Sequence, residues 1–190
     1  VVDGGDDGTA AAARRGGELV VRLAINRGQG DALRTGFQLA LHRGAEIVMT
    51  MDADGQHAPD DMISLVKPIV AGEADYVQGS RFIGTYDDEG GLRDGGIRIF
   101  TWLINRLSGT SITDCTNGFR AIRAEKLAGL RLEEGRFSAP ELIMESASRG
   151  LRIVEVPVHI RAREFGESKK PRRLGYPVGF LRVITRVWLR

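Results

Sequence analysis

Residues 45–57 read AEIVMTMDADGQH: an apolar run leads directly into two aspartates, a glycine, a glutamine and a histidine. The run has the composition of a buried strand, and Asp52 and Asp54, two positions apart, point the same way at its carboxyl end. An open α/β sheet binds its ligand at that edge. Because Mg²⁺ and Mn²⁺ prefer oxygen ligands and usually take one or two protein carboxylates beside phosphates and water, the pair predicts a metal–nucleotide site. A solvated acidic turn is the alternative.

Outward from this strand, the chain alternates between strand and helix patterns. The alternation predicts an α/β fold with a mostly parallel sheet and helices on both faces. Residues 84–96 carry many glycines and acids and predict a mobile surface loop. Val1–Asp3 has the pattern of a strand end, so we expect the first strand of the fold to be missing. Strands are expected over 19–25, 47–51, 74–78, 119–122 and 151–160, and helices over 9–15, 31–42, 59–70, 97–107, 139–148 and 178–189.

Size and composition limit the possible classes of protein. With 190 residues and 42% hydrophobic content, the chain can form one full core, and its length fits a single domain. The formal charge of +2 is too small to indicate a nucleic-acid partner. Cys115 is the one cysteine, so no internal disulfide is possible and a reducing, cytosolic setting is expected. No apolar run reaches the roughly 18 residues that span a bilayer.

Seven short motifs follow one another from Val1 to about Lys169. In this order they resemble family 2 glycosyltransferases of the nucleotide-sugar-binding A-type fold, in particular the polyprenyl (dolichyl) phosphate mannose and glucose synthases. The resemblance implies a single Rossmann-like domain. The motifs are VVDGG (1–5), NRGQGDAL (26–33) with GF (36–37), MDADGQH (51–57), GSRF (79–82), ITDCTNGFRA (112–121), EVPV (155–158) and GESK (166–169).

The resemblance assigns roles to the acidic motifs. Asp3 is expected to contact the base or ribose of the nucleotide. Asp52, Asp54 and Gln56 are expected to hold Mg²⁺ or Mn²⁺ and, through it, the donor diphosphate. The family's first strand, with its Pro-x-x-Asn-Glu type of turn, has no counterpart here, and the turn after Asp3 is one residue shorter than the usual form.

The resemblance also assigns a set of basic and hydroxyl residues. Arg81 and Arg93 are expected to meet phosphate, with Arg98 as the rival of Arg93. The residues that match a late Arg-x-x-Gly-x-Ser-Lys pattern and are expected to lie over the donor site are Arg163, Ser168 and Lys169.

The chemistry of sugar transfer separates two acceptors. Negative charge grows on the departing diphosphate, and a metal ion and cationic side chains stabilise it. A polyprenyl phosphate is already anionic, whereas a sugar hydroxyl needs a base. Asp114 is the candidate for that base, and capping its own turn is its alternative role. His57 either contacts a phosphate or is merely polar. The segment 28–30 lacks the Lys-Ser/Thr ending of a phosphate loop.

The C-terminal part is basic and amphipathic. Residues 161–173 predict a loop that closes over the diphosphate or lies on anionic lipid headgroups. The last helix mixes arginines with large apolar residues, which is typical of an interfacial helix, and core packing is the alternative. We expect a glycosyltransferase catalytic domain over 1–176 and an amphipathic helix over 177–190.

Together, these patterns predict a metal-dependent, inverting transfer of mannose or glucose to a polyprenyl phosphate. The donor is expected to be a GDP- or UDP-linked sugar. The protein is expected to be peripheral to the cytoplasmic face of the inner membrane and not to bind nucleic acid. Two alternatives stay open: transfer to a saccharide hydroxyl, and a truncated, inactive domain that binds a nucleotide or another protein.

Overall fold

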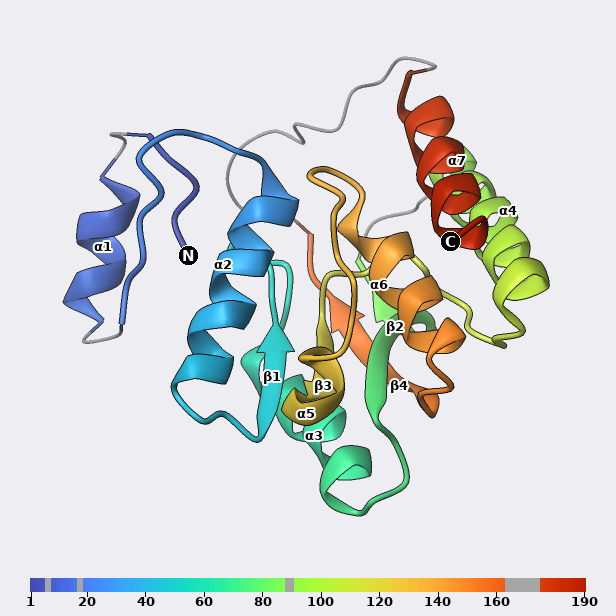
Figure 1. Cartoon of the computed structure of the whole chain (residues 1–190), viewed down its shortest axis with the longest axis horizontal. Helices are drawn as coiled ribbons and strands as arrows, with labels where there is room; N and C mark the ends of the chain where they lie inside the picture. Colours follow the sequence, from blue (N-terminus) through green and yellow to red (C-terminus); the bar gives the residue numbers. More distant parts are fainter. Residues whose placement is uncertain (6–7, 17–18, 88–90, 163–174) are drawn as a thin grey trace.

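A computed structural model describes residues 1–5, 8–16, 19–87, 91–162 and 175–190. Figure 1 shows a central sheet with helices around it and α1 standing to one side. The strands are β1 (Ile47–Thr50), β2 (Tyr76–Tyr86), β3 (Arg120–Arg123) and β4 (Ile153–Ile160). The helices are α1 (Thr9–Arg15), α2 (Gln29–His42), the 3₁₀ turn η1 (Pro59–Asp61), α3 (Met62–Val70), α4 (Gly91–Ser108), α5 (Ala124–Leu127), α6 (Ser138–Ser148) and α7 (Gly175–Trp188).

The four-stranded sheet has the order β1-β3-β2-β4 and is mixed. The strand β3 runs antiparallel to both β1 and β2, whereas β2 and β4 are parallel. Three strands therefore point one way, and the reversed β3 lies between two of them. As a result, the segment that enters β3 reaches the same edge of the sheet as the carboxyl ends of β1 and β2. The α/β class is confirmed, whereas the sheet expected to be mostly parallel is mixed because the reversed β3 pairs antiparallel with both of its neighbours.

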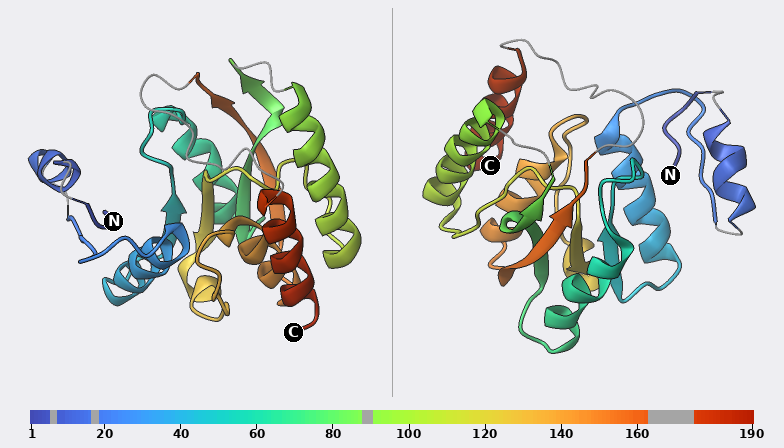
Figure 2. Two further views of the ribbon diagram at one scale, coloured as in Figure 1. Left: turned by 90° about the horizontal axis from the view of Figure 1, so that it is seen from above. Right: turned by 180° about the vertical axis from the view of Figure 1, so that it is seen from behind.

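Helices cover both faces of the sheet (Figure 2). On one face, Leu65 and Ile69 of α3 pack against Val77 of β2. The opposite face buries Tyr76 of β2 with apolar side chains of α2, α4, α6 and α7. Alternate residues of a strand point to opposite faces, so Tyr76 and Val77 serve different cores. Both layers together hold the loops at the upper edge of the sheet in Figure 1.

Two stretches differ from expectation. The expected strand at 19–25 is reduced to one isolated bridge, between Val2 and Arg22, and among the described residues no further strand lies beside this pair to extend it. The expected loop at 84–96 is wrong at both ends, since β2 continues to Tyr86 and α4 already begins at Gly91. Pairing of Thr85 with His159 of β4 extends β2 after a register shift.

The last helix packs into the main core. Phe180, Val183, Ile184 and Val187 of α7 are buried, and the ring of Phe180 lies 4.5 Å from that of Phe100. The opposite face of α7 leaves its large apolar residues exposed: Val178, Leu181 and Trp188, with Leu189 just beyond the helix. In the described part of the chain, we find no helix with the length and apolar character needed to cross a membrane.

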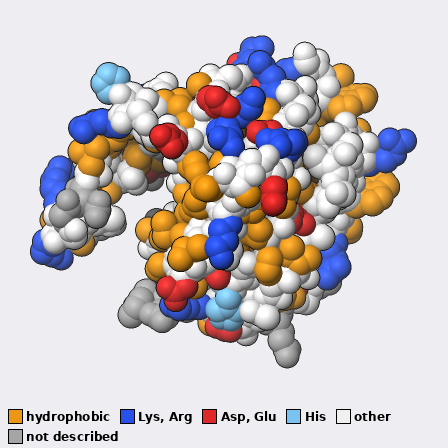
Figure 3. Space-filling model, turned by 90° about the horizontal axis from the view of Figure 1, so that it is seen from below, with side chains coloured by type: hydrophobic (Ala, Val, Ile, Leu, Met, Phe, Trp, Pro, Cys, Tyr) orange, Lys and Arg blue, Asp and Glu red, His pale blue; other side chains and the backbone are white. Residues whose placement is uncertain are grey.

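The surface has no extended field of one charge on the face seen in Figure 3, where acidic and basic side chains alternate with apolar ones. This mixture agrees with the small formal charge of +2.

Candidate active site

The turn after β1 presents the two aspartates that were predicted to bind metal. Asp52 lies two residues beyond the end of the strand, and its side chain is 47% exposed. Gly55 turns the chain with a φ of 78°, in the left-handed region that favours glycine. The backbone N–H of Gln56 donates a hydrogen bond to Asp54 Oδ1 at 3.2 Å. Both carboxylates therefore lie on one short turn at the edge where α/β sheets bind ligands.

This turn is tied to the chain that leaves β4. The N–H of Arg161 donates to the carbonyl of Gln56 at 2.8 Å, and Gln56 Nε2 donates to the carbonyl of Arg161 at 3.2 Å. His57 and Ile160 form an antiparallel bridge. The expected metal loop and the first residue of the expected basic loop are thus held together.

The donor set suits a divalent cation that binds together with a diphosphate. In the ranges that the structure describes, three or more His, Cys, Asp or Glu side chains do not gather into a metal cluster. Mg²⁺ and Mn²⁺ do not require one, since they take one or two carboxylates and complete their shells with phosphate and water oxygens. Asp52 and Asp54 offer the carboxylates and Gln56 an amide oxygen, so the residues fit such an ion.

His57 lies beneath the turn rather than open to a ligand. Only 8% of the residue is exposed, its ring centroid is 4.9 Å from that of Phe119, and its Nε2 lies 3.9 Å from Asp52 Oδ2. Its Nδ1 is buried without a hydrogen-bond partner among the described residues. The expected contact between this histidine and a phosphate therefore has no support from its position.

Arg81 and Asp114 form a buried ion pair. Arg81 Nε donates to Asp114 Oδ2 at 2.7 Å, and Asp114 is completely buried. The other oxygen of Asp114, Oδ1, accepts hydrogen bonds from the N–H and the hydroxyl of Thr116 at 3.1 Å. Asp114 therefore caps its own turn, which was the alternative to its role as a base. The positive charge of Arg81 is already balanced by the Asp114 carboxylate.

Glu155 is a member of this network that the sequence motifs did not assign. Its Oε2 accepts hydrogen bonds from the N–H and hydroxyl of Thr113, and its Oε1 accepts one from the N–H of Asp114. Burial raises the pKa of the Glu155 carboxyl, even though these hydrogen bonds act in the opposite direction. The only sequence signal was its place in the Glu-Val-Pro-Val motif of β4.

Asp3 lies at a separate corner, beside the start of α2. Its two carboxylate oxygens accept hydrogen bonds from the backbone N–H groups of Arg27 and Gly28, at 2.7 and 2.8 Å. In this position Asp3 joins the first segment of the chain to the Asn26–Leu33 motif. Its expected contact with the nucleotide stays a prediction.

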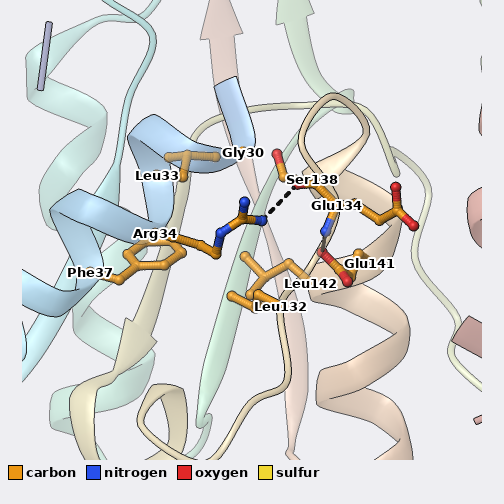
Figure 4. Close-up of a pocket in the computed structure, with 9 residues that line it drawn as sticks. All are labelled: Gly30, Leu33, Arg34, Phe37, Leu132, Glu134, Ser138, Glu141 and Leu142. Atoms are coloured by element: carbon orange, nitrogen blue, oxygen red, sulfur yellow. Dashed lines mark hydrogen bonds between the residues drawn. The ribbon is translucent and has the colours of Figure 1, made fainter. Parts of the chain in front are cut away.

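The glycines that open α2 serve close packing. The N–H of Gly30 donates to the carbonyl of Gly135 at 2.7 Å, and a Cβ at Gly30 would come within 1.9 Å of the Glu134 carbonyl oxygen. Figure 4 shows Arg34 of the same helix donating to that carbonyl, at 3.1 Å, beside a small pocket against α6. The N–H groups of Gly28 and Gly30 therefore donate to protein atoms.

The structure describes only some of the remaining basic residues that were expected in the site. Arg93 falls in the first turn of α4, and its side chain lies outside the described part. Arg98, its rival, is exposed and lies over the ring of Phe82 at 4.6 Å. The residues of the late pattern, Arg163, Ser168 and Lys169, lie outside the described residues. Their expected contacts with the donor stay predictions.

Comparison with known sequences identifies the family of the chain. The model of glycosyl transferase family 2 matches residues 1–130. The chain is 32% identical over 167 residues to an undecaprenyl-phosphate mannosyltransferase of Micrococcus luteus, covering 79% of this chain and 63% of that protein. It is 33% identical over 193 residues to polyprenol monophosphomannose synthase of Mycolicibacterium smegmatis, covering 89% and 68%. The chain spans about two thirds of the length of these relatives.

Solved structures agree on the fold. Glucosyl-3-phosphoglycerate synthase of Mycobacterium tuberculosis, in complex with Mn²⁺ and UDP-glucose, superposes with a TM-score of 0.70 at 23% identity, covering 98% of this chain and 64% of that one. This likeness concerns the fold alone. The resemblance predicted from the seven motifs is confirmed by the family model and by relatives above 30% identity. The chain belongs to glycosyl transferase family 2.

Proposed function

We propose that this chain is the catalytic part of a metal-dependent glycosyltransferase that moves a hexose from a nucleoside-diphosphate sugar to a polyprenyl phosphate. Two relatives above 30% identity carry names that join mannose to undecaprenyl or polyprenol phosphate. Mannose or glucose, carried on GDP or UDP, is the proposed donor. A structural neighbour contains Mn²⁺ with UDP-glucose, which supports a divalent metal at Asp52, Asp54 and Gln56.

The proposed reaction exchanges one bond for another at the anomeric carbon. An oxygen of the polyprenyl phosphate forms a bond to that carbon from the face opposite the leaving group, so the configuration inverts. The bond from the carbon to the donor diphosphate breaks, and the nucleoside diphosphate leaves with the electron pair. A metal ion, when bound, stabilises the negative charge that grows on the diphosphate. Asp52 and Asp54 would hold this ion and, through it, orient the donor diphosphate.

The burial and hydrogen bonds of Asp114 are the observation that favours one acceptor over the other. Transfer to a sugar hydroxyl needs a group that removes the hydroxyl proton. Asp114 was the candidate, yet it is buried, with one oxygen bound to Arg81 and the other to Thr116. A phosphate acceptor needs no such base because it is already an anion at neutral pH. The geometry therefore supports the phosphate acceptor over the hydroxyl acceptor.

A polyprenyl acceptor lies in a membrane, and the protein is proposed to meet that membrane from the cytoplasmic side. The exposed face of α7 carries Val178, Leu181 and Trp188 beside Arg182, a combination that suits an interface between lipid headgroups and acyl chains. Sedimentation with vesicles containing anionic phospholipid tests this contact. The proposal expects Leu181→Glu to weaken co-sedimentation without changing the thermal midpoint.

Transfer of radiolabelled sugar tests the central proposal. GDP-mannose and UDP-glucose are offered separately with polyprenyl phosphate, with the unphosphorylated polyprenol or with a free saccharide, in the presence of Mn²⁺ or of a chelator. The proposal expects transfer to the phosphate alone and loss of transfer with the chelator. Asp54→Ala should abolish the reaction, whereas Asp60→Ala, a nearby exposed acid, should not.

The alternatives give different results in the same experiment. Transfer to the saccharide would favour the hydroxyl acceptor. A folded chain that transfers no sugar and shows no heat on calorimetric titration with UDP or GDP and Mn²⁺ would favour an inactive interaction domain. Unchanged transfer by Asp54→Ala would overturn the metal assignment.

A further inference from the structure

We infer that Gly118 is a positioning residue for the metal site, because its missing side chain leaves the space that the Asp52 carboxylate occupies. A Cβ built on Gly118 would lie 2.8 Å from Asp52 Oδ2 and 3.0 Å from both Cγ and Oδ1. Carbon atoms do not approach so closely without displacement. The inference rests on the proposed binding of metal by Asp52.

The need for glycine at this position is one of space and not of backbone conformation. Gly118 is absent from the glycines with positive φ, so alanine meets no strain in the backbone. Gly55, in the metal turn itself, is the opposite case: its φ is 78° and no atom lies within 4 Å of a built Cβ. One glycine shapes the turn that carries the aspartates, and the other admits an aspartate against a second loop.

That second loop is held in place from several sides. Thr50 of β1 donates its hydroxyl to the carbonyl of Gly118 at 2.7 Å. The carbonyl of Asn117 accepts hydrogen bonds from Gln78 Nε2 at 3.0 Å and from Arg120 Nε at 2.7 Å. The N–H of Phe119 donates to Asn117 Oδ1 at 3.0 Å. A side chain at position 118 would therefore displace the end of Asp52 rather than the buried loop.

Two neighbouring groups limit where this half-exposed carboxylate can go. His57 Nε2 lies 3.9 Å from Asp52 Oδ2, and the imidazole itself is packed on Phe119. With His57 on one side and Gly118 on another, the carboxylate has a defined position beside the 117–119 turn. Fixing a ligand before the metal arrives lowers the ordering required on binding, and groups that orient ligands typically change metal affinity about 10- to 100-fold when altered.

A double-mutant cycle on Mn²⁺ binding tests the inference. Electron paramagnetic resonance measures free Mn²⁺ in the presence of UDP for the unaltered chain, Gly118→Ala, Asp52→Ala and the double variant. We expect Gly118→Ala to weaken Mn²⁺ binding by about 10-fold or more. In the Asp52→Ala background the same change should have no further effect, because the displaced carboxylate is no longer there.

Gly129→Ala is the matched control. Gly129 has no positive φ, and its built Cβ makes an ordinary contact at 3.5 Å with the Lys126 carbonyl oxygen, away from the metal turn. It should leave Mn²⁺ binding unchanged. Sugar transfer gives a second readout. Gly118→Ala should lose activity at a low concentration of Mn²⁺ and regain it as the concentration is raised. A variant with a damaged fold would not regain activity in this way.

Thermal unfolding without metal keeps the inference testable if Gly118→Ala folds poorly. Removing the Asp52 carboxylate should then restore the midpoint that Gly118→Ala lowers. Two results would overturn the inference about Gly118 while leaving the metal assignment intact. One is Mn²⁺ binding by Gly118→Ala equal to that of the unaltered chain. The other is an equal loss of Mn²⁺ affinity from Gly118→Ala in the unaltered chain and in the Asp52→Ala background. If Asp52→Ala itself binds Mn²⁺ normally, the proposed metal assignment fails as well.

Discussion

The loop that enters β3 and the corner formed by the first segment of the chain contribute to the same motif series, yet they are built differently. Residues 112–120 are largely buried, and Arg81, Glu155 and Gln78 match many of their polar groups. Asn117 Nδ2 is the exception within the described part of this loop, since it is buried without a hydrogen-bond partner. The first segment meets the rest of the chain through the hydrogen bonds of Asp3, the isolated bridge of Val2 and the buried Gly4, whose backbone packs closely on that of Asn26. The helix α1 beside it has no buried residue. The two regions both contain family motifs, and they differ in how deeply their residues are buried.

The difference in burial between the loop and the Asp3 corner indicates which part of the site is fixed before a ligand binds. In the 112–120 loop, breaking one hydrogen bond leaves a buried group without a partner, which costs more than the bond itself contributes. At the Asp3 corner the released groups can turn to water, so opening costs little. We therefore expect the loop to unfold with the whole protein and the corner to open locally.

Removing the carboxylate of Asp114 should have the largest effect. Asp114→Ala leaves the Arg81 guanidinium buried without its ion pair, and we expect a loss of about 3 kcal/mol in the free energy of unfolding. Urea unfolding at pH 7 measures it, with the exposed Asp60→Ala as the control. A loss below about 1 kcal/mol would mean that the loop is no more rigid than an ordinary surface.

The ion pair between Asp75 and Arg152 provides a reference outside the loop. Arg152 holds the pKa of Asp75 at about 2, mainly through a side-chain hydrogen bond. A lowered pKa contributes stability above the unfolded value near 4, and that contribution is lost as the pH falls towards 2. Because the Arg152 side chain is 54% exposed, we expect only about 1 kcal/mol.

Urea midpoints of the unaltered chain and Asp75→Asn, measured between pH 7 and pH 2, check this expectation. The two curves should converge as the pH approaches 2. A difference that stays constant across this range would assign the effect to packing. If Asp75→Asn lowers the free energy of unfolding at pH 7 as much as Asp114→Ala does, the proposed distinction between the buried loop and a half-exposed ion pair is wrong.

Loss of the Asp3 carboxylate should act locally. Asp3→Ala removes the acceptor for the N–H groups of Arg27 and Gly28. We expect hydrogen exchange at these two amides to rise about tenfold, which corresponds to about 1.4 kcal/mol, while the thermal midpoint changes little. Exchange at the amides of Asp114 and Phe119 should be unaffected. A clear fall in the midpoint would show that the corner is coupled to the core.

The thiol of Cys115 should show the smallest effect of all. Burial raises its pKa to about 12, so the reactive thiolate is scarce at neutral pH. We expect a thiol reagent at pH 8 to modify Cys115 no faster than the whole protein unfolds, with full reaction in urea as the control. Rapid modification of the folded chain would show that the loop opens by itself.

Local sequence predicted the parts of the site that one segment can form alone. An apolar run followed by two aspartates was enough to place Asp52 and Asp54 at the carboxyl end of β1. The burial of Asp114 was not predictable, because Asp114 lies in a loop and its partner Arg81 lies 33 positions away, on β2. The role of Glu155 was hidden for the same reason.

The direction and length of strands also depend on distant residues. A short apolar pattern at 119–122 indicated a strand but not that it would run against its neighbours. Glycines and acids at 84–96 indicated a loop, whereas pairing with β4 carries β2 through Tyr86. Residues 19–25 have an adequate strand pattern, yet their pairing with Val2 stays a single bridge, and the described part of the chain places no further strand beside it. Tertiary partners decide such cases.

The reversed strand also has a consequence for how the chain folds. In the sheet, β1 and β2 are joined only through β3, which lies between them. The strand β3 pairs with β1 at a separation of about 70 residues, as in Thr50 with Arg120. Pairings that close such long loops slow folding, since the entropy is lost before the contacts form. While the protein is being synthesised, β1 and β2 therefore both expose unpaired edges until residues 120–123 have emerged. The centre of the sheet is completed late, and the loop that positions Asp52 is completed with it.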